Sequence, residues 1–274
     1  MKLPLPRTLP KADIGVFDSG LGGLSVLREI QRQAPGASVL YLADTANVPY
    51  GDKPIGVVRD LALQLTECLV DAGVQLVVMA SGTSTVAGLE AARSRFPHLP
   101  IAGTIEPGAE AAVSIPEGPI GVLATNATVQ SRAFTEAVQA LNPQRQAIEV
   151  GCPKFVPLVE TGRADTQEAQ EAALEYLRPL HAAGVQSIIL GCTHFPFLQA
   201  VLHHAVSQIG DPAFQPRFVD PAAAAVRKAL PLLTLTTGSA GLVSFAATGD
   251  PEDFRCFASR LLGTPIDFVA PLML

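Results

Sequence analysis

The sequence predicts an α/β protein made of two pseudo-symmetric domains, each a parallel-sheet α/β sandwich, with a ligand cleft between them. Two observations predict this fold class. Short apolar runs alternate with helix-period segments along the chain, which is typical of parallel sheets covered by helices on both faces. In addition, one segment occurs twice, as AGVQLVVMASGT (72–83) and AGVQSIILGCTH (183–194).

The repeated segment contains a small nucleophilic side chain at the same place in both copies. The first apolar run leads to Ser81, and the second leads to Cys192. Open α/β sheets bind ligands at the carboxyl ends of their strands. Two such ends are therefore expected to face one cavity from opposite sides, an arrangement that suits chemistry on both faces of a single carbon.

Two shorter pairs of segments support an internal duplication. IGVFDS (14–19) resembles IGVLAT (120–125), and VPY (48–50) resembles VPL (156–158). Their near-constant spacing of about one domain length indicates a repeat rather than chance matches.

Each expected element follows from its local pattern. Apolar runs bounded by turn residues predict the strands, and apolar residues that recur at helical spacing predict the helices. The expected strands are residues 14–17, 39–42, 76–79, 101–102, 120–124, 147–150, 187–190, 218–219 and 242–246. The expected helices are residues 23–34, 57–72, 84–95, 129–141, 166–183 and 197–207.

The chain is expected to cross between the domains near 104–107 and to return near 220–221. The segment from 220 onward has no counterpart in the duplicated core, so we expect it to fold back on the first half. The first domain then comprises residues 1–105 and 219–274, and the second comprises residues 106–218. A length of 274 residues suits two domains of ordinary size.

The composition indicates a globular protein that binds neither nucleic acid nor a membrane. The chain is 48% apolar and 16% charged, with a net charge of −6 and no tryptophan. Nucleic-acid-binding surfaces are instead basic and often rich in aromatic side chains. The amino-terminal MKLPLPRTLPKAD lacks the apolar core of a signal peptide, and no apolar stretch is long enough to cross a bilayer. We therefore expect a cytoplasmic protein.

Cysteine spacing argues against a metal centre. The chain has four cysteines, at positions 68, 152, 192 and 256, which lie far apart and without CxxC spacing. We therefore expect no metal site and no disulfide framework.

The glycine-rich segment FDSGLGG (17–23) follows the first expected strand. It resembles a dinucleotide fingerprint, but the third glycine of that motif falls on Ser25, so the motif fails. A glycine-rich turn at a helix start can hold a carboxylate with backbone N–H groups. The alternative is a tight turn in which Asp18 or Ser19 caps the helix. Asp18 lies on the same sheet edge as Ser81, where its carboxylate can orient or polarise a neighbouring group.

The turn NVPYG (47–51) follows the second expected strand. Tyr50 lies between Pro49 and Gly51, which hold it rigid on a loop. Such a turn either contacts a ligand or is an ordinary surface turn.

The strongest local signal is LGCTHF (190–195). Cys192 lies beside Thr193 and His194 at a strand end, where a helix is expected to begin. A helix N-terminus and a nearby imidazolium both favour a reactive cysteine thiolate, and the N–H groups there can bind an anion. Glu160 either fixes the tautomer of His194 or is a solvated residue at a helix start.

With these residues identified, the chain resembles the glutamate racemases, a family of the aspartate/glutamate racemase superfamily, over nearly its whole length. The matching segments are IGVFDSGLGGLSVL, ADTANVPYG, GTIEPGAEAA, CPKFVPLVE, LGCTHFPFL, FVDPA and TGDPEDF. The resemblance implies an active site in the cleft between the domains, glutamate as the small-molecule substrate, no cofactor or metal, and a homodimer. It also implies two cysteines on opposite sides of the substrate Cα, and D-glutamate for peptidoglycan as the product.

By position, the resemblance implies that Cys192 is the base toward L-glutamate, supported by His194 and Glu160. Asp18 would assist on the opposite face. The implied substrate contacts are Asp18, Ser19, Pro49, Tyr50, Gly51, Gly82, Thr83, Thr125, Thr128, Thr193 and His194.

The first cysteine motif departs from the family. The family pattern is Ala-Cys-Asn-Thr, whereas this chain has Ala80-Ser81-Gly82-Thr83. A hydroxyl is a far weaker acid than a thiol, and each pK unit is worth about 1.4 kcal/mol. We therefore expect an asymmetric enzyme in which Cys192 removes the proton of L-glutamate and Ser81, or a water it holds, donates on the other face. The reverse direction should be strongly impaired, and Ser81→Cys with Gly82→Asn should recover two-way turnover.

Two other classes of function stay open. One is another reaction of the superfamily, either racemisation of aspartate or hydantoins or one-cysteine decarboxylation of malonates. The other is a degenerate, non-catalytic protein that binds glutamate or a partner protein. The Tyr50-Gly51 turn and the Thr193-His194 pair favour glutamate.

Overall fold

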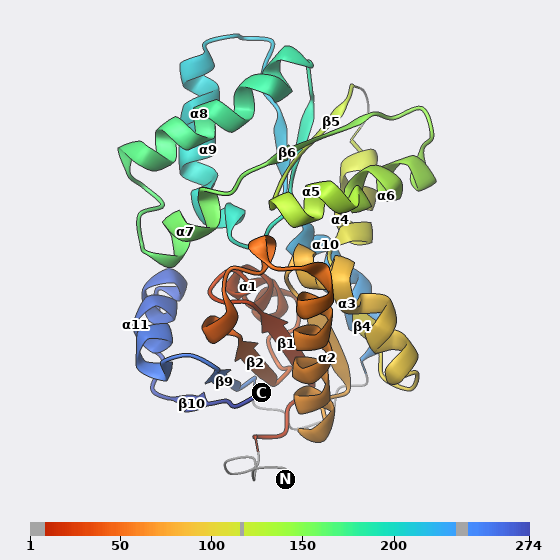
Figure 1. The fold of residues 1–274 in the computed structure, drawn as a ribbon, viewed down its shortest axis with the longest axis vertical. Helices are drawn as coiled ribbons and strands as arrows, with labels where there is room; N and C mark the ends of the chain where they lie inside the picture. Colours follow the sequence, from red (N-terminus) through yellow and green to blue (C-terminus); the bar gives the residue numbers. More distant parts are fainter. Residues whose placement is uncertain (1–8, 116–117, 234–240) are drawn as a thin grey trace.

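The computed structural model describes residues 9–115, 118–233 and 241–274. Within these residues the chain forms two parallel sheets, and in Figure 1 the second sheet lies above the first. The first sheet has the order β10-β9-β2-β1-β3-β4, and the second has the order β6-β5-β7-β8. The strands are β1 (Ile14–Asp18), β2 (Val39–Ala43), β3 (Leu76–Met79), β4 (Ile101–Ala102), β5 (Ile120–Ala124), β6 (Ala147–Gly151), β7 (Ser187–Leu190), β8 (Arg217–Val219), β9 (Val243–Ala247) and β10 (Val269–Pro271).

The two sheets repeat one strand order. The order β2-β1-β3-β4 in the first sheet matches β6-β5-β7-β8 in the second, and every paired strand is parallel. β3 and β7, the strands of the repeated segment, therefore occupy equivalent positions. The carboxyl ends of both strands lead toward the junction of the sheets, where reactive side chains can meet.

Helices cover both sheets. They are α1 (Leu24–Gln33), α2 (Ile55–Asp71), α3 (Gly82–Arg95), α4 (Ile105–Val113), α5 (Asn126–Ser131), α6 (Ala133–Leu141), α7 (Phe155–Glu160), α8 (Gln167–Ala182), α9 (Gln199–Ile209), α10 (Pro221–Ala229) and α11 (Pro251–Leu262). All nine expected strands are present to within one residue at each end. The expected helix 129–141 is interrupted, because Arg132 takes a left-handed conformation (φ 57°) between α5 and α6.

The carboxyl-terminal segment returns to the first sheet, as expected. β9 pairs with β2, and β10 pairs with β9, so this segment extends the first sheet at one edge. α4 packs against α6 and α10 where the chain passes between the two sheets. The limits 1–105 plus 219–274 and 106–218 stay a prediction.

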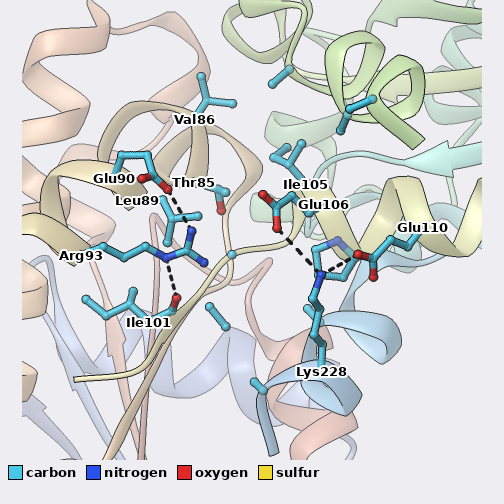
Figure 2. A pocket seen from close by; sticks show the side chains of 18 of the residues that line it. Thr85, Val86, Leu89, Glu90, Arg93, Ile101, Ile105, Glu106, Glu110 and Lys228 are labelled. Carbon is cyan, nitrogen blue, oxygen red and sulfur yellow. Dashed lines mark hydrogen bonds and ion pairs between the residues drawn. The ribbon is translucent and has the colours of Figure 1, made fainter. Parts of the chain in front are cut away.

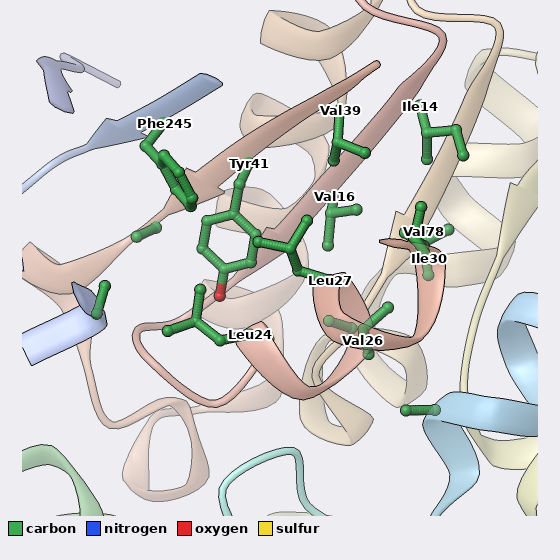
Figure 3. Close-up of a cluster of buried hydrophobic side chains, with 14 of the residues drawn as sticks. Ile14, Val16, Leu24, Val26, Leu27, Ile30, Val39, Tyr41, Val78 and Phe245 are labelled. Atoms are coloured by element: carbon green, nitrogen blue, oxygen red, sulfur yellow. The ribbon is translucent and has the colours of Figure 1, made fainter. Parts of the chain in front are cut away.

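The core under the first sheet positions the candidate site. Leu24 and Leu27 of α1 pack on Tyr41 and Val16, and all four side chains are fully buried (Figure 3). Burial of one such side chain contributes roughly 1.5–3 kcal/mol. The Tyr41 hydroxyl also donates a hydrogen bond to the Gly20 carbonyl (2.8 Å), so this core fixes the glycine-rich loop.

No helix in the described ranges combines the length and apolarity that crossing a bilayer requires.

Candidate active site

A cavity of about 30 Å³ lies where strand ends of the two sheets meet. It brings together most of the residues expected from the sequence. Those that line it are Ser19, Pro49, Tyr50, Gly51, Ser81, Thr83, Thr125, Cys192, Thr193 and His194. Pockets that bury a small-molecule ligand usually measure 300–1,000 Å³. The cavity is therefore in a closed form, and a ligand must separate its walls to enter.

Ser81 and Cys192 approach this cavity from the two halves of the repeat. Ser81 follows β3 in the first sheet, Cys192 follows β7 in the second, and both line the same cavity. Both side chains are nearly buried, with 7% and 9% exposure respectively. The structure therefore brings the hydroxyl and the thiol to one shared space, as the duplication predicts.

Ser81 also caps a helix. Its Oγ accepts a hydrogen bond from the Ser84 backbone N–H (3.3 Å), the usual N-cap interaction, at the start of α3. The oxygen is thus engaged as an acceptor, while the hydroxyl proton can be donated elsewhere. The positive end of the helix dipole stabilises negative charge on this oxygen. This geometry suits Ser81 to proton donation more than to proton removal.

His194 connects Cys192 to Glu160. Its Nε2 lies 2.5 Å from Glu160 Oε1, and its Nδ1 lies 3.7 Å from Cys192 Sγ. The Glu160 carboxylate fixes an N–H on Nε2, so Nδ1 can take the thiol proton or donate to the thiolate. The expected partnership of His194 and Glu160 is therefore present. Glu160 is the last residue of α7 and not a solvated residue at a helix start.

The His194–Glu160 contact is a buried ion pair. Burial alone lowers the pKa of His194, but hydrogen bonds to Cys192 and Glu160 outweigh it and hold that pKa well above its ordinary value. Burial raises the pKa of Glu160, but the hydrogen bond from His194 outweighs it and leaves that pKa below its ordinary value. Both directions favour the imidazolium–carboxylate pair.

The glycine-rich loop binds a carboxylate, and that carboxylate belongs to the protein. The Leu21 backbone N–H donates to Glu160 Oε1 (2.9 Å). A Cβ at Gly20 would overlap Glu160 Oε1, and one at Gly22 would overlap Thr193 Oγ1. The glycines therefore allow the loop of the first sheet to touch the segments after β6 and β7. The capping alternative is wrong, because the N-cap of α1 is Gly23 and no described side chain caps it.

Asp18 is fully buried behind the cavity lining. Its Oδ1 accepts from Thr193 Oγ1 and its Oδ2 accepts from the Gly20 N–H, both at 3.1 Å. Burial raises the pKa of Asp18, and the charge of His194 partly offsets this rise. Its hydrogen bond thus reaches across to the Cys192 side, whereas the sequence predicted assistance to Ser81.

The turn after β2 is held by a buried carboxylate that the sequence reading missed. Asp44 accepts hydrogen bonds from Tyr50 OH (2.6 Å), Asn47 Nδ2 (3.0 Å) and Thr248 Oγ1 (2.6 Å). Burial, followed by the charge of Asp44, raises the pKa of Tyr50 far above its ordinary value. The Tyr50 hydroxyl therefore keeps its proton and donates it in the hydrogen bond to Asp44. Contacts of this turn with a ligand must use its backbone N–H groups, the ring, or the hydroxyl as an acceptor.

Three hydroxyls form a cluster that spans both sheets. Thr83 Oγ1 lies 3.0 Å from Thr125 Oγ1, and Thr125 Oγ1 lies 3.1 Å from Thr128 Oγ1. Thr83 belongs to α3, and the other two belong to the start of α5. Hydroxyls can donate or accept, so the cluster can reorient around a charged ligand group.

Two details of this region differ from the expected geometry. Gly82 lies outside the lining of this cavity and packs against the end of β7, where an added Cβ would come within 2.8 Å of the Gly191 carbonyl oxygen, and its contact with substrate stays a prediction. A helix does not begin directly after Cys192. A short 3₁₀ turn (Phe195–Leu198) intervenes, and α9 starts only at Gln199.

Other residues of the lining were not expected. Asn126, Cys152 and Val156 line the cavity from the second sheet and its helices. Burial raises the pKa of the Cys152 thiol well above its ordinary value, so this thiol stays protonated and inert. Asn126 follows Thr125 in the repeat that matches residues 14–19, so its position beside a strand end was the available signal.

A larger cavity lies elsewhere. It measures about 630 Å³ and lies between α3, β4, α4, α6 and α10 (Figure 2). Four of its charged side chains form ion pairs, Arg93 with Glu90 (2.9 Å) and Lys228 with Glu110 (2.5 Å). No cysteine or histidine is among its described lining. Proton-transfer chemistry at carbon therefore fits the smaller cavity.

No cluster of three or more His, Cys, Asp or Glu side chains in the described part of the chain could hold a metal ion.

Most of this chain is similar to proteins of one known family. The Asp/Glu/Hydantoin racemase family model matches residues 14–229. Glutamate racemase of Microcystis aeruginosa is 41% identical over 254 residues, which cover 91% of this chain and 87% of that protein. The crystal structure of glutamate racemase from Francisella tularensis in complex with D-glutamate superposes with a TM-score of 0.85 at 26% identity, covering 97% and 98% of the chains. Glutamate racemase from Thermus thermophilus in complex with β-chloro-D-alanine gives 0.82 at 35% identity, covering 97% and 98%.

Proposed function

Because this chain belongs to the Asp/Glu/Hydantoin racemase family, we propose that it interconverts L- and D-glutamate by removing and returning the α-proton. The product D-glutamate supplies peptidoglycan synthesis. The observation that carries the reaction is the shared cavity lined by Ser81 from one sheet and Cys192 from the other. Inversion of a stereocentre by proton transfer requires acid–base groups on opposite faces of one carbon, and the placement of these two side chains on different sheets supports that assignment.

Cys192 acts as the base toward L-glutamate in this proposal. The thiolate takes the α-proton, and His194, 3.7 Å from Sγ, stabilises the thiolate as an imidazolium. Glu160 keeps His194 protonated and oriented through the 2.5 Å contact. A carbanion then forms in a closed site with buried side chains, where fixed dipoles interact more strongly than in water.

Ser81 delivers the proton on the other face. Its oxygen is held by the Ser84 N–H and its hydroxyl proton is free to leave. The resulting alkoxide is a strong base, so donation is slow, and this step limits the inversion of configuration. Proton removal from D-glutamate by Ser81 is slow for the same reason, because a neutral hydroxyl is a poor base.

Net turnover cannot be one-way. The two enantiomers have equal free energy, so kcat/KM must be equal in both directions, and weakening Ser81 lowers both equally. The asymmetry expected from the sequence must instead appear in α-proton exchange. L-Glutamate can lose its proton to Cys192 and regain a solvent proton on the same face, without inversion.

The amino and carboxylate groups of the substrate are expected to bind around the strand ends. Candidates are the hydroxyl cluster of Thr83 and Thr125, Ser19, Thr193 and the backbone of Gly51, all of which line the cavity. A glutamate molecule must separate these walls to enter.

Glutamate is favoured over the other substrates of the family by the names of the similar proteins, which are glutamate racemases. A panel of L-glutamate, L-aspartate, a hydantoin and a malonate, followed by chiral chromatography and by release of CO₂, tests this choice. Inversion of glutamate alone is expected. Faster inversion of aspartate or decarboxylation of the malonate would replace the proposal, and binding of glutamate without inversion or exchange would indicate a degenerate binder.

We further propose a cytoplasmic homodimer. All four cysteines are free thiols, which suits a reducing compartment. The exposed apolar residues Phe268 and Met273 flank the edge strand β10 in sequence and suit an interface between copies. Light scattering coupled to size exclusion would give twice the 28.6 kDa chain mass for a dimer.

A further inference from the structure

A second, smaller cavity lies behind Cys192. It measures about 10 Å³, the space of about one water molecule, and we call it the rear cavity. Ser25 of α1, Thr104 and Asp220 line it together with Cys192 and Thr193. Cys192 and Thr193 also line the candidate active site, so the two cavities meet at these residues.

The Ser25 hydroxyl indicates a bound ligand in the rear cavity. Ser25 is only 6% exposed, and its Oγ has no hydrogen-bond partner within the described residues 9–115, 118–233 and 241–274. A buried hydroxyl left without a partner costs about 1–3 kcal/mol. Water is the ligand that fits both the size of this cavity and the few polar side chains of its mostly apolar lining, among them Ser25, Thr104 and Asp220.

Asp220 supplies a titratable group at the same cavity. It caps α10, with Oδ1 accepting from the Ala222 N–H (2.9 Å), so its second oxygen can face other partners. Burial raises the pKa of Asp220 to about 6, the Ala222 hydrogen bond opposes this, and the charge of Glu29 adds to it. The residue as a whole keeps partial solvent exposure, which gives its carboxyl group a short route for exchanging protons with solvent.

Most of the charged side chains around Asp220 are paired with a side chain of opposite charge. On α1, Glu29 pairs with Arg32 (2.8 Å), and on α4, Glu110 pairs with Lys228 of α10 (2.5 Å). Cys192 faces Asp220 across the rear cavity. Arg227 of α10 lowers the pKa of Glu29, and Glu106 of α4 lies 3.9 Å from Lys228. Asp220 is thus the carboxyl group of the described lining that changes protonation at a pH of about 6.

We propose that Ser25 and Asp220 hold a water molecule in the rear cavity and that this water carries the proton of Cys192 to and from solvent, an inference that rests on the proposed racemase function. After Cys192 has taken the α-proton, its S–H bond breaks and the proton passes to the water. The water gives one of its own protons to the Asp220 carboxylate. A thiolate and a carboxylic acid result, the water is regenerated, and no electrons are transferred. Asp220 then releases the proton to solvent.

This relay has a specific consequence for a site whose proposed acid–base pair is one thiol and one hydroxyl. Ser81 donates its proton slowly, so the carbanion persists beside the Cys192 thiol. During this lifetime the relay exchanges the thiol proton with solvent. L-Glutamate then regains a solvent proton with retention of configuration. Without the relay, the same proton returns to L-glutamate, and α-proton exchange does not exceed the exchange that accompanies inversion.

The variant Asp220→Asn tests the relay with little effect on the fold. Asparagine is as good an N-cap as aspartate, so the Ala222 contact survives while the titratable group is lost. Asp250→Asn is the matched control, because Asp250 also caps a helix that begins with proline and lies outside the rear cavity. The readout is the ratio of α-proton loss from L-glutamate in D₂O, by NMR, to inversion, by circular dichroism.

In the wild type this ratio is expected to exceed one and to rise as pH passes about 6, where Asp220 becomes a carboxylate able to accept protons. Asp220→Asn should lower the ratio about tenfold and remove its pH dependence, and Asp250→Asn should change neither. Ser25→Ala should lower the ratio in the same direction.

Other outcomes overturn the relay. An unchanged ratio and pH profile in Asp220→Asn would do so, as would a wild-type ratio of one. If the wild type neither inverts glutamate nor exchanges its α-proton, the proposed function itself fails, and the two failures are therefore distinguishable.

Discussion

Ser81 and Cys192 occupy equivalent places after β3 and β7, but they offer chemically unequal groups. Cys192 Sγ has His194 Nδ1 at 3.7 Å, whereas Ser81 Oγ contacts only the Ser84 N–H among the described hydrogen bonds. One side of the site therefore carries a supported thiol and the other carries a capping hydroxyl. This difference between thiol and hydroxyl predicts unequal rates of proton transfer at the two positions.

Replacing Ser81 with cysteine should speed inversion. The thiol is the stronger acid, each pK unit is worth about 1.4 kcal/mol, and a rise in kcat/KM of about tenfold or more is expected, equal in both directions. Circular dichroism measures it from either enantiomer. Ser84→Cys, in the same helix, is the control. No rise in Ser81→Cys, or an equal rise in Ser84→Cys, would contradict the role given to position 81.

The His194–Glu160 pair should make the free energy of unfolding depend on pH. The pKa of His194 is raised above 6.5 in the folded protein. The stabilisation that His194 contributes is therefore complete below pH 6.5 and is lost as pH rises through the raised pKa. The pKa of Glu160 is lowered below 4.5, so its contribution is complete above that value and is lost as pH falls through the lowered pKa. The pair therefore stabilises the fold most between 4.5 and 6.5.

Glu160→Gln should remove this dependence. Breaking a buried pair is expected to destabilise the protein by about 3 kcal/mol, most of all in the window between the two ordinary pKa values. Thermal unfolding across the pH range, compared with the exposed pair variant Glu175→Gln, measures it. A wild-type pH profile that Glu160→Gln leaves intact would show that the pair is not ionised.

Residue-level predictions from the sequence succeeded where the partner was implied by a local motif. The His194–Glu160 contact and the shared space of Ser81 and Cys192 could be predicted, because strand ends of a parallel sheet face one edge. The anchoring of Tyr50 by Asp44 could not, because Thr248 completes that network from far along the chain. Hydrogen bonds between distant segments leave no pattern in a single sequence.

At the level of elements, the start of α3 and the end of β7 control how closely the two sheets approach. Gly82 opens α3, and an added Cβ there would lie 2.8 Å from the Gly191 carbonyl oxygen. A backbone carbonyl cannot move aside as a flexible side chain can. Glycine at this position therefore permits the closed form of the site, and Gly82→Asn opposes that closure. The expected recovery by the double replacement Ser81→Cys with Gly82→Asn is accordingly less favourable than by Ser81→Cys alone.

The variant Gly82→Ala should reduce turnover without unfolding the protein. The added methyl group forces the strand ends apart by a few tenths of an ångström, and misplacement of reacting groups by about 1 Å can lower rates about 100-fold. A fall in kcat with little change in the melting temperature is expected. Gly56→Ala on α2, where the added Cβ meets nothing within 4 Å, is the control. Full activity in Gly82→Ala would contradict the closure role.

The elements themselves were predicted unevenly. All nine expected strands form, because buried parallel strands read as continuous apolar runs. The break at Arg132 was missed, because a left-handed residue other than glycine or asparagine has no sequence signal. The edge strand β10 was also missed, since it is short and ends in Pro271, which a central strand would exclude.

At the scale of the whole molecule, two copies of one fold enclose a closed site, and each copy supplies one of the two proposed acid–base groups. The duplication visible in the sequence explains the equivalent strand orders of the sheets. The degree of closure could not be predicted from it, because closure depends on contacts such as Gly82 against Gly191 and the glycine-rich loop against Glu160. Substrate entry must therefore involve separation of the two halves.

The most direct test of this unequal pair is α-proton exchange measured on each enantiomer separately. L-Glutamate in D₂O is expected to lose its α-proton about tenfold faster than it inverts, because Cys192 removes the proton readily and Ser81 donates slowly. D-Glutamate is expected to lose its α-proton no faster than it inverts. Equal exchange rates for the two enantiomers would show that positions 81 and 192 are equally competent and would contradict the asymmetry.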